Sequence, residues 1–380
     1  MISVDPRIAT GRLTIDLDAL VANWRFMAEK SGKARTAAVV KADAYGTGLE
    51  TSATALAGAG CGTFFVAVPD EAIRLKAALP GVTVYVLSGV FNSDSAAAVA
   101  QCGARPVLNS LAQIEIWGRH CRAVLKNLPC AIHADTGMNR LGLTAQEALV
   151  FGRVNGRAAI VSPDLLMSHL ACADDPAHPM SGQQLESFQQ VRAVFPGVDS
   201  SLANSAGVFL GPDFHFDLTR PGIALYGGAA VNGVPNPMRP VVTAEARILQ
   251  VRHARAGEAV SYGATQVLAR DSRIAIAGTG YADGFHRASS GAGAPLRDAV
   301  AKGGLGWLAG HRVPILGRVT MDLTLFDVTD VPEQALEGAD WIELFGPNIA
   351  LDEAAQAAGT IGYELLTSLG ARYERHILQG

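Results

Sequence analysis

One lysine in this sequence stands where its amine could act as a nucleophile. Lys41 follows the apolar residues 37–40, "AAVV", and precedes the segment 42–46, "ADAYG". An amine that is partly removed from water loses its proton more easily, and a neutral amine can attack a carbonyl carbon. A surface lysine whose aliphatic stem packs against its neighbours would show the same pattern. The position of Lys41 therefore indicates Schiff-base chemistry but leaves an ordinary surface lysine open.

Further polar residues follow short apolar runs in the same way, namely His133, Asp135, His169, Asn204, Ser205 and Arg220. Two segments, "ANSAG" at 203–207 and "RPGIALYG" at 220–227, offer N–H and hydroxyl donors for a phosphate group. Glycine and serine are equally ordinary in turns. A carbonyl cofactor that carries a phosphate, such as pyridoxal 5'-phosphate, would need both the lysine and such donors.

The elements that would position these residues can be located from hydrophobic patterns. Short apolar runs recur between Ala-rich amphipathic segments and begin at residues 36, 64, 82, 104, 129, 163, 199 and 218. Capping boxes between them predict helix starts, at Ser110–Gln113, Thr144–Glu147 and Ser181–Gln184. This alternation predicts an α/β fold with an N-terminal (β/α)8 TIM-type barrel. The carboxyl ends of such strands carry the chemistry, so the polar residues above should face one mouth.

The pattern changes after residue 240, where β-rich segments such as "VVTAEARILQV" and "SRIAIAGTG" are separated by glycine turns. We therefore expect a barrel domain over residues 1–240 and a mostly β C-terminal domain over residues 241–380. The segment Asn232–Pro240, "NGVPNPMRP", is rich in Pro, Asn and Gly and is expected to join the two domains.

The composition limits the partners of the chain. Its 380 residues carry a net charge of -4 without a long run of Lys or Arg, which argues against nucleic acid as a partner. Neither a secretory signal nor an apolar segment long enough to span a bilayer is recognisable, so we expect a cytoplasmic protein without a membrane partner. The scattered cysteines predict neither disulfides nor metal ligands, and they are Cys61, Cys102, Cys121, Cys130 and Cys172.

Nine segments together resemble the alanine racemase family in their order and spacing. They are "VVKADAYG", "DTGMNRLG", "MSHLACAD", "ANSAG", "RPGIALYG", "SYGAT", "GYADGFHR", "GRVTMD" and "GYELLT", and they extend over nearly the whole chain. The resemblance implies a barrel that binds pyridoxal 5'-phosphate, a C-terminal β domain and a homodimer. It also implies that the chain interconverts L-alanine and D-alanine and provides D-alanine for peptidoglycan in the bacterial cell wall.

The resemblance implies two acid–base residues. Racemisation must remove a proton from one face of Cα and return one to the other face, so two groups are needed. Lys41 matches the family's Schiff-base lysine, which handles the D-alanine proton, and Tyr262 in "SYGAT" matches the tyrosine that handles the L-alanine proton. In the family this tyrosine reaches the active site from the partner subunit. Without the resemblance, a packed aromatic residue in a β turn would be the ordinary interpretation of Tyr262.

The remaining site residues are also implied by the resemblance. Arg220 matches the arginine that faces the pyridine nitrogen of the cofactor, although an arginine fixed in an ion pair stays open. His169 matches the histidine that connects the tyrosine to this arginine, although a core histidine stays open. Phosphate contacts are implied for Tyr45, Ser205, Tyr363 and the backbone of Gly222 and Ile223, with Asn204 close by. Substrate binding is implied for Arg140 and the N–H of Met321, and the substrate entrance for Tyr281 and Asp322.

Three positions depart from the family pattern. Thr47 stands where the motif has a histidine, and Thr320 stands where some members have cysteine or serine. His133 stands where some members carry a carbamylated lysine that orients the arginine corresponding to Arg140. Because a carbamate cannot form on His133, the way in which Arg140 is held stays open. None of these departures removes an acid–base group.

Other functions fit the sequence less well. Aspartic proteases need two carboxylates that share a proton, and Asp135–Gly137 is the only D-T-G segment, with no D-S-G. The segment "GTGYADG" lacks the spacing of a dinucleotide-binding loop. A racemase for another small amino acid such as serine stays open, and so does a non-catalytic protein that binds pyridoxal phosphate. The second of these usually lacks a C-terminal β domain. A decarboxylase of related fold would favour an acidic residue in place of Arg220.

Overall fold

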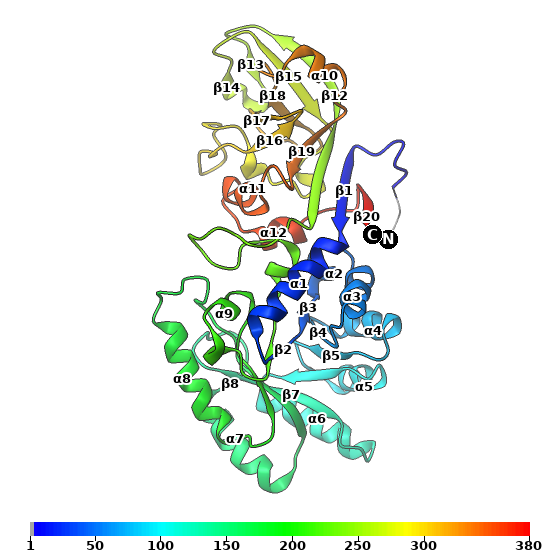
Figure 1. The fold of residues 1–380 in the computed structure, drawn as a ribbon, viewed down its shortest axis with the longest axis vertical. Helices are drawn as coiled ribbons and strands as arrows, with labels where there is room; N and C mark the ends of the chain where they lie inside the picture. The colour runs from blue at the N-terminus through cyan, green and yellow to red at the C-terminus, as the bar shows by residue number, and fades with distance from the viewer. Residues whose placement is uncertain (1–3) are drawn as a thin grey trace. The chain divides into compact units, whose positions relative to one another are not determined.

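The computed structural model describes residues 4–380, which form two compact units. One unit comprises residues 20–225 and 229–238, and the other comprises residues 4–19, 226–228 and 239–380. We call them the barrel unit and the β unit and describe each by itself (Figure 1). Within residues 4–380 no helix has the length and hydrophobicity that crossing a membrane requires.

The barrel unit contains the predicted ring of short parallel strands. Its strands are β2 (Arg35–Thr36), β3 (Ala38–Val39), β4 (Thr63–Val66), β5 (Thr83–Val86), β6 (Arg105–Leu108), β7 (Pro129–Asp135), β9 (Ser162–Met167), β10 (Asp199–Ser201) and β11 (Leu218–Thr219). β2 and β3 occupy one position, so the strands fill the eight positions of the barrel. A short strand, β8 (Leu143–Thr144), pairs with β7.

The ring closes through β11. The continuous sheet runs in the order β3, β4, β5, β6, β7, β9, β10. β11 pairs in parallel with β2 on one side. On its other side the N–H of Asp217 donates to the carbonyl of Ser200 at 3.0 Å, and the N–H of Arg220 donates to the carbonyl of Ala203 at 2.9 Å. The predicted (β/α)8 barrel is therefore confirmed.

Helices alternate with these strands and lie around them (Figure 1). They are α1 (Leu17–Ser31), α2 (Lys41–Tyr45), α3 (Leu49–Gly58), α4 (Pro69–Ala78), α5 (Ser93–Gln101), α6 (Leu111–Ala123), α7 (Ala145–Ala158), α8 (Met180–Arg192) and α9 (Ser205–Phe209), with 3-10 turns η1 (Pro212–Phe214) and η2 (Ile223–Tyr226). Buried side chains from the strand ring fill the barrel interior, namely Ala37, Phe65, Tyr85, Val107, Ala131, Leu165, Met167 and Leu218. Close packing of these residues keeps the strand ends rigid.

Two of the three predicted helix starts are correct, and one of these has the complete capping box. Thr144 caps α7 in a complete capping box with Glu147, and Ser110 caps α6 by accepting the N–H of Gln113. The third prediction is wrong, because α8 begins at Met180 and Ser181 lies inside its first turn. Gln184 turns instead toward the preceding loop, where its side chain accepts the N–H of Ala171 at 2.8 Å and donates to the carbonyl of His169 at 2.9 Å. A tertiary contact has replaced the local cap.

The β unit is mostly antiparallel, as predicted. Its strands are β1 (Gly11–Asp16), β12 (Val242–Ala254), β13 (Ala259–Val260), β14 (Gln266–Val267), β15 (Ser272–Ala277), β16 (Leu305–Leu308), β17 (His311–Leu316), β18 (Thr324–Asp327), β19 (Trp341–Phe345) and β20 (Tyr373–Leu378). The order β12, β15, β18, β17, β16, β19 returns to β12, so these strands form a closed ring. Short elements connect them, namely α10 (Glu333–Glu337), α11 (Leu351–Ala357), α12 (Gly362–Thr367), η3 (Tyr262–Ala264), η4 (Tyr281–Asp283) and η5 (Arg287–Ser289).

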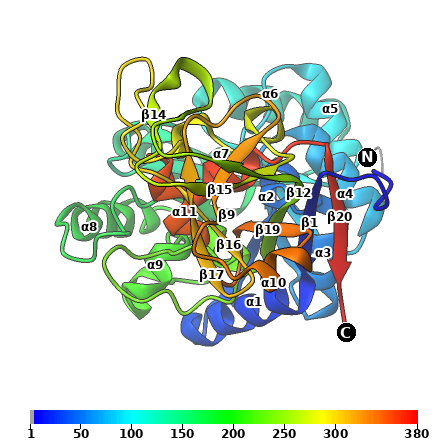
Figure 2. The same cartoon turned by 90° about the horizontal axis from the view of Figure 1, so that it is seen from above.

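The first strand belongs to the β unit and not, as we expected, to the barrel. β1 pairs antiparallel with β12 and parallel with β20, which runs beside it (Figure 2). Its alternating buried and half-buried residues fit a strand with one covered face. The wider division at residue 240 stays a prediction, with this segment as an exception.

Candidate active site

The polar residues that were predicted to share the barrel mouth lie at or just beyond the carboxyl ends of the strands. Lys41 follows β3 after one residue, His133 and Asp135 lie at the end of β7, His169 follows β9, Asn204 and Ser205 follow β10, and Arg220 follows β11 directly. Electrostatic interactions connect Lys41, His133 and His169 with Arg140, which lies in the loop after β7. The two histidines also interact with Arg220. The barrel therefore gathers these groups at one place.

The chain after Lys41 forms one turn of left-handed helix. Ala42, Asp43, Ala44 and Tyr45 have φ between 53° and 54°. The N–H of Ala44 donates to the carbonyl of Val40 at 3.0 Å, and the turn ends at Gly46. Left-handed helix costs about 1–2 kcal/mol for each residue other than glycine, so the surrounding structure must hold this turn in place.

Lys41 itself is half-buried. Burial and the positive charge of Arg140 lower the pKa of Lys41, and the carboxylate of Glu71 opposes this change. A lowered pKa increases the fraction of neutral amine at physiological pH, which both Schiff-base formation and proton abstraction require.

Tyr45, Ser205 and Gly222 form a compact cradle of donors. The N–H of Gly222 donates to Oγ of Ser205 at 2.8 Å. A Cβ at position 222 would overlap the hydroxyl of Tyr45, so only glycine allows this close approach. Asn204 caps α9 by accepting the N–H of Gly207 at 2.9 Å and thereby fixes the start of the helix at Ser205. The next residue of the second segment, Ile223, is buried.

Arg220 is a buried cation. Its guanidinium donates to Oγ of Ser201 and to the carbonyl of Ser168, the latter at 2.5 Å. Among residues 4–380 it forms no ion pair, so the alternative of an arginine fixed by a carboxylate is wrong. Burial lowers the pKa of Arg220 to about 9, which still leaves it charged at neutral pH. The side chain can therefore donate a hydrogen bond to a ligand atom but keeps its proton.

His133 is a buried, neutral imidazole. Its Nδ1 lies 2.8 Å from Oδ1 of Asn109, while Nδ2 of Asn109 donates to the carbonyls of Leu87 and Val107. The amide of Asn109 is therefore oriented with its oxygen toward the ring, so Nδ1 of His133 carries the proton and Nε2 is an acceptor. Burial, reinforced by Arg220, lowers the pKa of His133 to about 4. Burial also lowers the pKa of His169, again reinforced by Arg220.

The backbone around Arg140 is held by Asp135, which answers part of the question left open by the sequence. One carboxylate oxygen of Asp135 accepts the N–H groups of Gly137 and Met138, both at 2.8 Å, and the other accepts the N–H of Arg140 at 3.2 Å. The guanidinium of Arg140 makes no hydrogen bond or ion pair with any residue from 4 to 380. It is thus positioned by its backbone and available to an anionic ligand.

The β unit brings three of the predicted residues, Tyr262, Tyr281 and Met321, onto neighbouring loops. Tyr262 begins η3 and is 72% exposed, so it is not a packed aromatic residue in this chain. Ser261, beside it, donates to the carbonyl of Arg318 at 2.8 Å. The N–H of Tyr281 donates to the carbonyl of Thr320 at 3.0 Å, which places Tyr281 beside Met321.

Two further predicted residues of the β unit have partners of their own. Asp322 accepts from Arg372 at 2.8 Å, and Arg372 also binds the buried Asp283, so Asp322 is part of a structural ion-pair group. Tyr363 lies in the first turn of α12 and is partly exposed. The backbone N–H of Met321 donates to no residue between 4 and 380 and therefore has a free donor for a ligand.

Family comparisons agree with this geometry. The family model described as the N-terminal domain of alanine racemase matches residues 15–230, and the model of the C-terminal domain matches residues 241–377. This chain belongs to the alanine racemase family.

Individual alanine racemases resemble the chain over almost its whole length. The biosynthetic alanine racemase of Agrobacterium fabrum is 56% identical, with 97% of this chain and 93% of the relative covered. The alanine racemase of Rhizobium meliloti is 54% identical, with 98% of each chain covered. The crystal structure of alanine racemase from Bartonella henselae, which holds covalently bound pyridoxal phosphate, superimposes with a TM-score of 0.88 at 40% identity. The superposition covers 97% of this chain and 100% of the Bartonella henselae chain.

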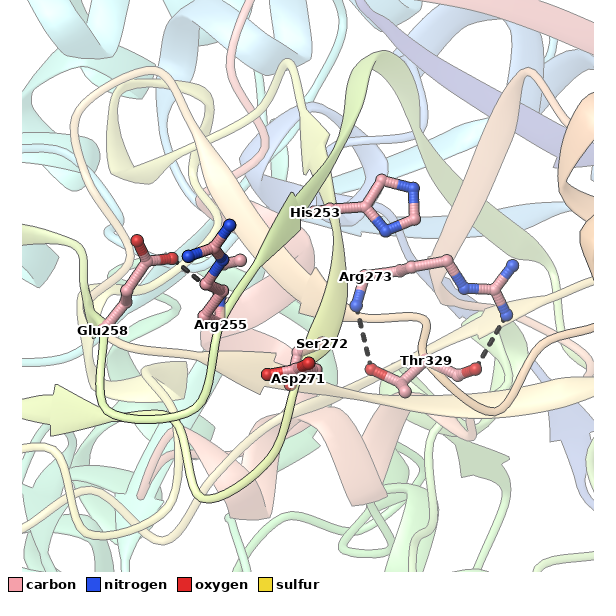
Figure 3. Close-up of a pocket in the computed structure, with 8 residues that line it drawn as sticks. His253, Arg255, Glu258, Asp271, Ser272, Arg273 and Thr329 are labelled. Atoms are coloured by element: carbon pink, nitrogen blue, oxygen red, sulfur yellow. Dashed lines mark hydrogen bonds between the residues drawn. The ribbon is translucent and has the colours of Figure 1, made fainter.

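A separate cavity of about 520 Å³ opens in the β unit of this alanine racemase family member, beside β12 and β15 (Figure 3). It is lined by His253, Ala254, Arg255, Glu258, Asp271, Ser272, Arg273 and Thr329. Its polar groups bind one another, since the N–H of Arg255 donates to Glu258 at 2.7 Å and Arg273 donates to Thr329. None of the predicted site residues lines this cavity, so it is not part of the candidate active site.

Two residues of the site were missed by sequence reasoning. Asn109 fixes the tautomer of His133, and Glu71 accepts hydrogen bonds from the turn after Lys41. Glu71 follows Pro69, a residue common in the first turn of a helix, so it could have been recognised as a helix-capping residue. No local signal indicates that the same carboxylate also reaches residues 42 and 43.

Proposed function

We propose that this chain is a pyridoxal 5'-phosphate-dependent racemase that interconverts L-alanine and D-alanine. The observation that carries the proposal is the half-buried Lys41 at the barrel mouth, near a buried arginine without a carboxylate partner, in a chain of the alanine racemase family. The covalently bound cofactor in the Bartonella henselae relative supports the same assignment.

The residues at the mouth fit this cofactor. The cradle of Tyr45, Ser205 and Gly222 presents two hydroxyl groups that can donate to a phosphate, and the missing side chain at Gly222 lets the Tyr45 hydroxyl lie close to it. The guanidinium of Arg220 is buried and has further N–H groups that need a hydrogen-bond acceptor in place of water, which the lone pair of a pyridine nitrogen would supply. We further assign phosphate contacts to Tyr363 and the backbone of Ile223, with Asn204 close by, and to His169 the role of connecting Tyr262 to Arg220.

In the proposed mechanism two side chains exchange the proton on Cα. When bound, the cofactor withdraws electrons from Cα and makes its proton acidic. Lys41 removes or returns this proton on the face of D-alanine, and Tyr262 does so on the face of L-alanine. Arg140 and the N–H of Met321 bind the carboxylate of the substrate, for which a forked donor is well suited. Tyr281 and Asp322 narrow the entrance.

We propose that the active enzyme is a homodimer in the cytoplasm and that Tyr262 acts in the site of the partner subunit. The 72% exposure of Tyr262 in the single chain supports this assignment, because a side chain that acts in the partner subunit must be exposed on the surface of its own chain. The D-alanine formed would serve peptidoglycan synthesis.

Deuterium exchange tests the reaction. Purified protein is incubated separately with L-alanine, L-serine and L-lysine in D2O, and chirality and deuterium at Cα are measured. We expect both changes with L-alanine. Exchange with L-serine alone would move the function to another amino acid, and no exchange with any substrate despite bound cofactor would favour a non-catalytic binding protein.

Two further experiments test the residues. Borohydride reduction followed by peptide mapping should attach the cofactor to Lys41, and a tag on Lys126 or Lys302 would overturn the assignment. Tyr262→Phe should abolish racemisation while the absorbance of the lysine-bound cofactor persists. Tyr85→Phe, which removes a hydroxyl bound to Asp164 inside the barrel, is the matched control and should turn over like wild type. Full turnover by Tyr262→Phe would refute its role.

A further inference from the structure

One buried carboxylate accepts hydrogen bonds from two separate turns of the barrel unit. Glu71 lies in the first turn of α4 and is 8% exposed. Its Oε1 accepts the N–H of Ala42 at 2.6 Å and the N–H of Asp43 at 3.4 Å. These are the first N–H groups of the left-handed turn after Lys41, and such terminal donors have no partner within their own helix.

The other oxygen of Glu71 caps its own helix. Oε2 accepts the N–H of Ala67 at 2.7 Å and the N–H of Val68 at 3.4 Å. This is the ordinary contact of a glutamate at the third position of a helix. Because both oxygens are used, the carboxylate joins the end of β4 to the turn that follows β3.

A second side chain of α4 binds the same turn. Arg74, three residues after Glu71, donates from Nη2 to Oδ1 of Asp43 at 2.9 Å and from Nε to Glu50 at 2.8 Å. Oδ1 of Asp43 also accepts the N–H of Leu49 at 3.1 Å. The left-handed turn is therefore held from one helix at two places, and Glu71 is the buried one.

We propose that Glu71 is a positioning residue, which holds residues 42–45 in the left-handed turn and thereby sets the amine of Lys41 and the hydroxyl of Tyr45 for the cofactor. This inference rests on the proposed function, because it assumes that Lys41 and Tyr45 bind pyridoxal phosphate. Tyr45 lies four positions after Lys41, at the other end of this turn, so unwinding the turn would move one side chain relative to the other. The negative charge of Glu71 also acts on Lys41, whose pKa it raises against the effects of burial and Arg140.

Glu71→Gln tests the inference with little change of shape. An amide has one acceptor oxygen, so either the pair at residues 42 and 43 or the pair at residues 67 and 68 must lose its acceptor. Hydrogen exchange of the protein without cofactor should therefore rise about 10- to 100-fold in at least one of these segments. The rate of cofactor release from the holoenzyme should rise over the same range. Exchange and release at wild-type values would overturn the inference.

Glycine substitutions separate positioning from general stability. Ala42 is exposed and left-handed, whereas Ala112 is exposed in the right-handed helix α6. Glycine adopts the left-handed region without steric cost. Ala42→Gly in the Glu71→Gln background should slow cofactor release about three- to tenfold, and Ala112→Gly, the matched control, should not. Equal effects of the two substitutions would contradict the positioning role.

The experiment remains decisive if Glu71→Gln does not fold. Ala42→Gly in the otherwise wild-type chain should retain the cofactor at least as long as wild type, and faster release would contradict the role of the strained turn. Failure of the proposed function would be recognised by a different result, namely that borohydride does not attach the cofactor to Lys41 of the wild type. The hydrogen-exchange comparison needs no cofactor and still tests Glu71 in that case.

Discussion

Gly222 is the position where a single added methyl group should weaken cofactor binding most directly. In Gly222→Ala the new Cβ would overlap the hydroxyl of Tyr45 and lie 3.3 Å from its Cζ and 3.6 Å from Cβ of Val39. Tyr45 is 5% exposed and its backbone lies in the left-handed turn, so only a small shift of its ring away from Gly222 can relieve this overlap.

The size of the effect follows from the overlap. Inserting a methyl group into a well-packed site costs about 1–3 kcal/mol. In the free protein the ring of Tyr45 can relieve part of this strain by shifting, but cofactor binding requires the hydroxyl to return to the cradle. The strain therefore reduces the free energy of cofactor binding. Since 1.4 kcal/mol corresponds to a factor of ten, cofactor affinity should fall about 5- to 150-fold.

The assay is a spectroscopic titration of the protein without cofactor, which yields the dissociation constant of pyridoxal phosphate. Gly62→Ala is the matched control, since a Cβ there meets no atom within 4 Å, and it should bind like wild type. Tyr45→Phe removes the overlapping oxygen, so Gly222→Ala should have little additional effect in that background. Wild-type affinity of Gly222→Ala, or an equal loss with and without the hydroxyl of Tyr45, would refute the reasoning.

Two further predictions concern stability. The pKa of His133 falls from 6.5 in the unfolded chain to about 4 in the fold, so the unfolded chain binds the proton first as the pH falls. The difference in pKa should therefore change the free energy of unfolding by up to about 3 kcal/mol. This stability is fully present above pH 6.5 and is lost as the pH falls toward 4. Urea unfolding should show a smaller loss over this range in His133→Gln, whereas His253→Gln, in the exposed second half of β12, should match wild type. Thr144→Ala should cost about 0.5–2 kcal/mol because it removes the cap of α7. Ser181→Ala should be neutral, because the Ser181 hydroxyl is buried without a partner among residues 4–380; a loss as large as that of Thr144→Ala would restore Ser181 as a cap.

The sequence determined the parts of the fold that depend on local periodicity. Apolar runs at regular intervals with amphipathic segments between them predicted each barrel strand, because a strand in such a barrel is buried on both faces. Lys41, His133 and Arg220 could be placed at the barrel mouth for the same reason, since each ends or follows an apolar run. The order of nine motifs, which depends on the chain alone, was sufficient to recognise the family.

The tertiary structure decided which distant groups meet. The segment after Lys41 contains alanine, which favours right-handed helix, yet it winds left-handed because Glu71 and Arg74 of α4 bind it. β1 belongs to the β unit because it pairs with β12 and β20. Both partners follow it by more than 200 residues, so no local pattern around β1 indicates this pairing. The tautomer of His133 is likewise set by Asn109, which follows the neighbouring strand β6. Such contacts leave no trace in local patterns, because a hydrogen bond depends on the distance between its atoms in space and not on their separation along the chain.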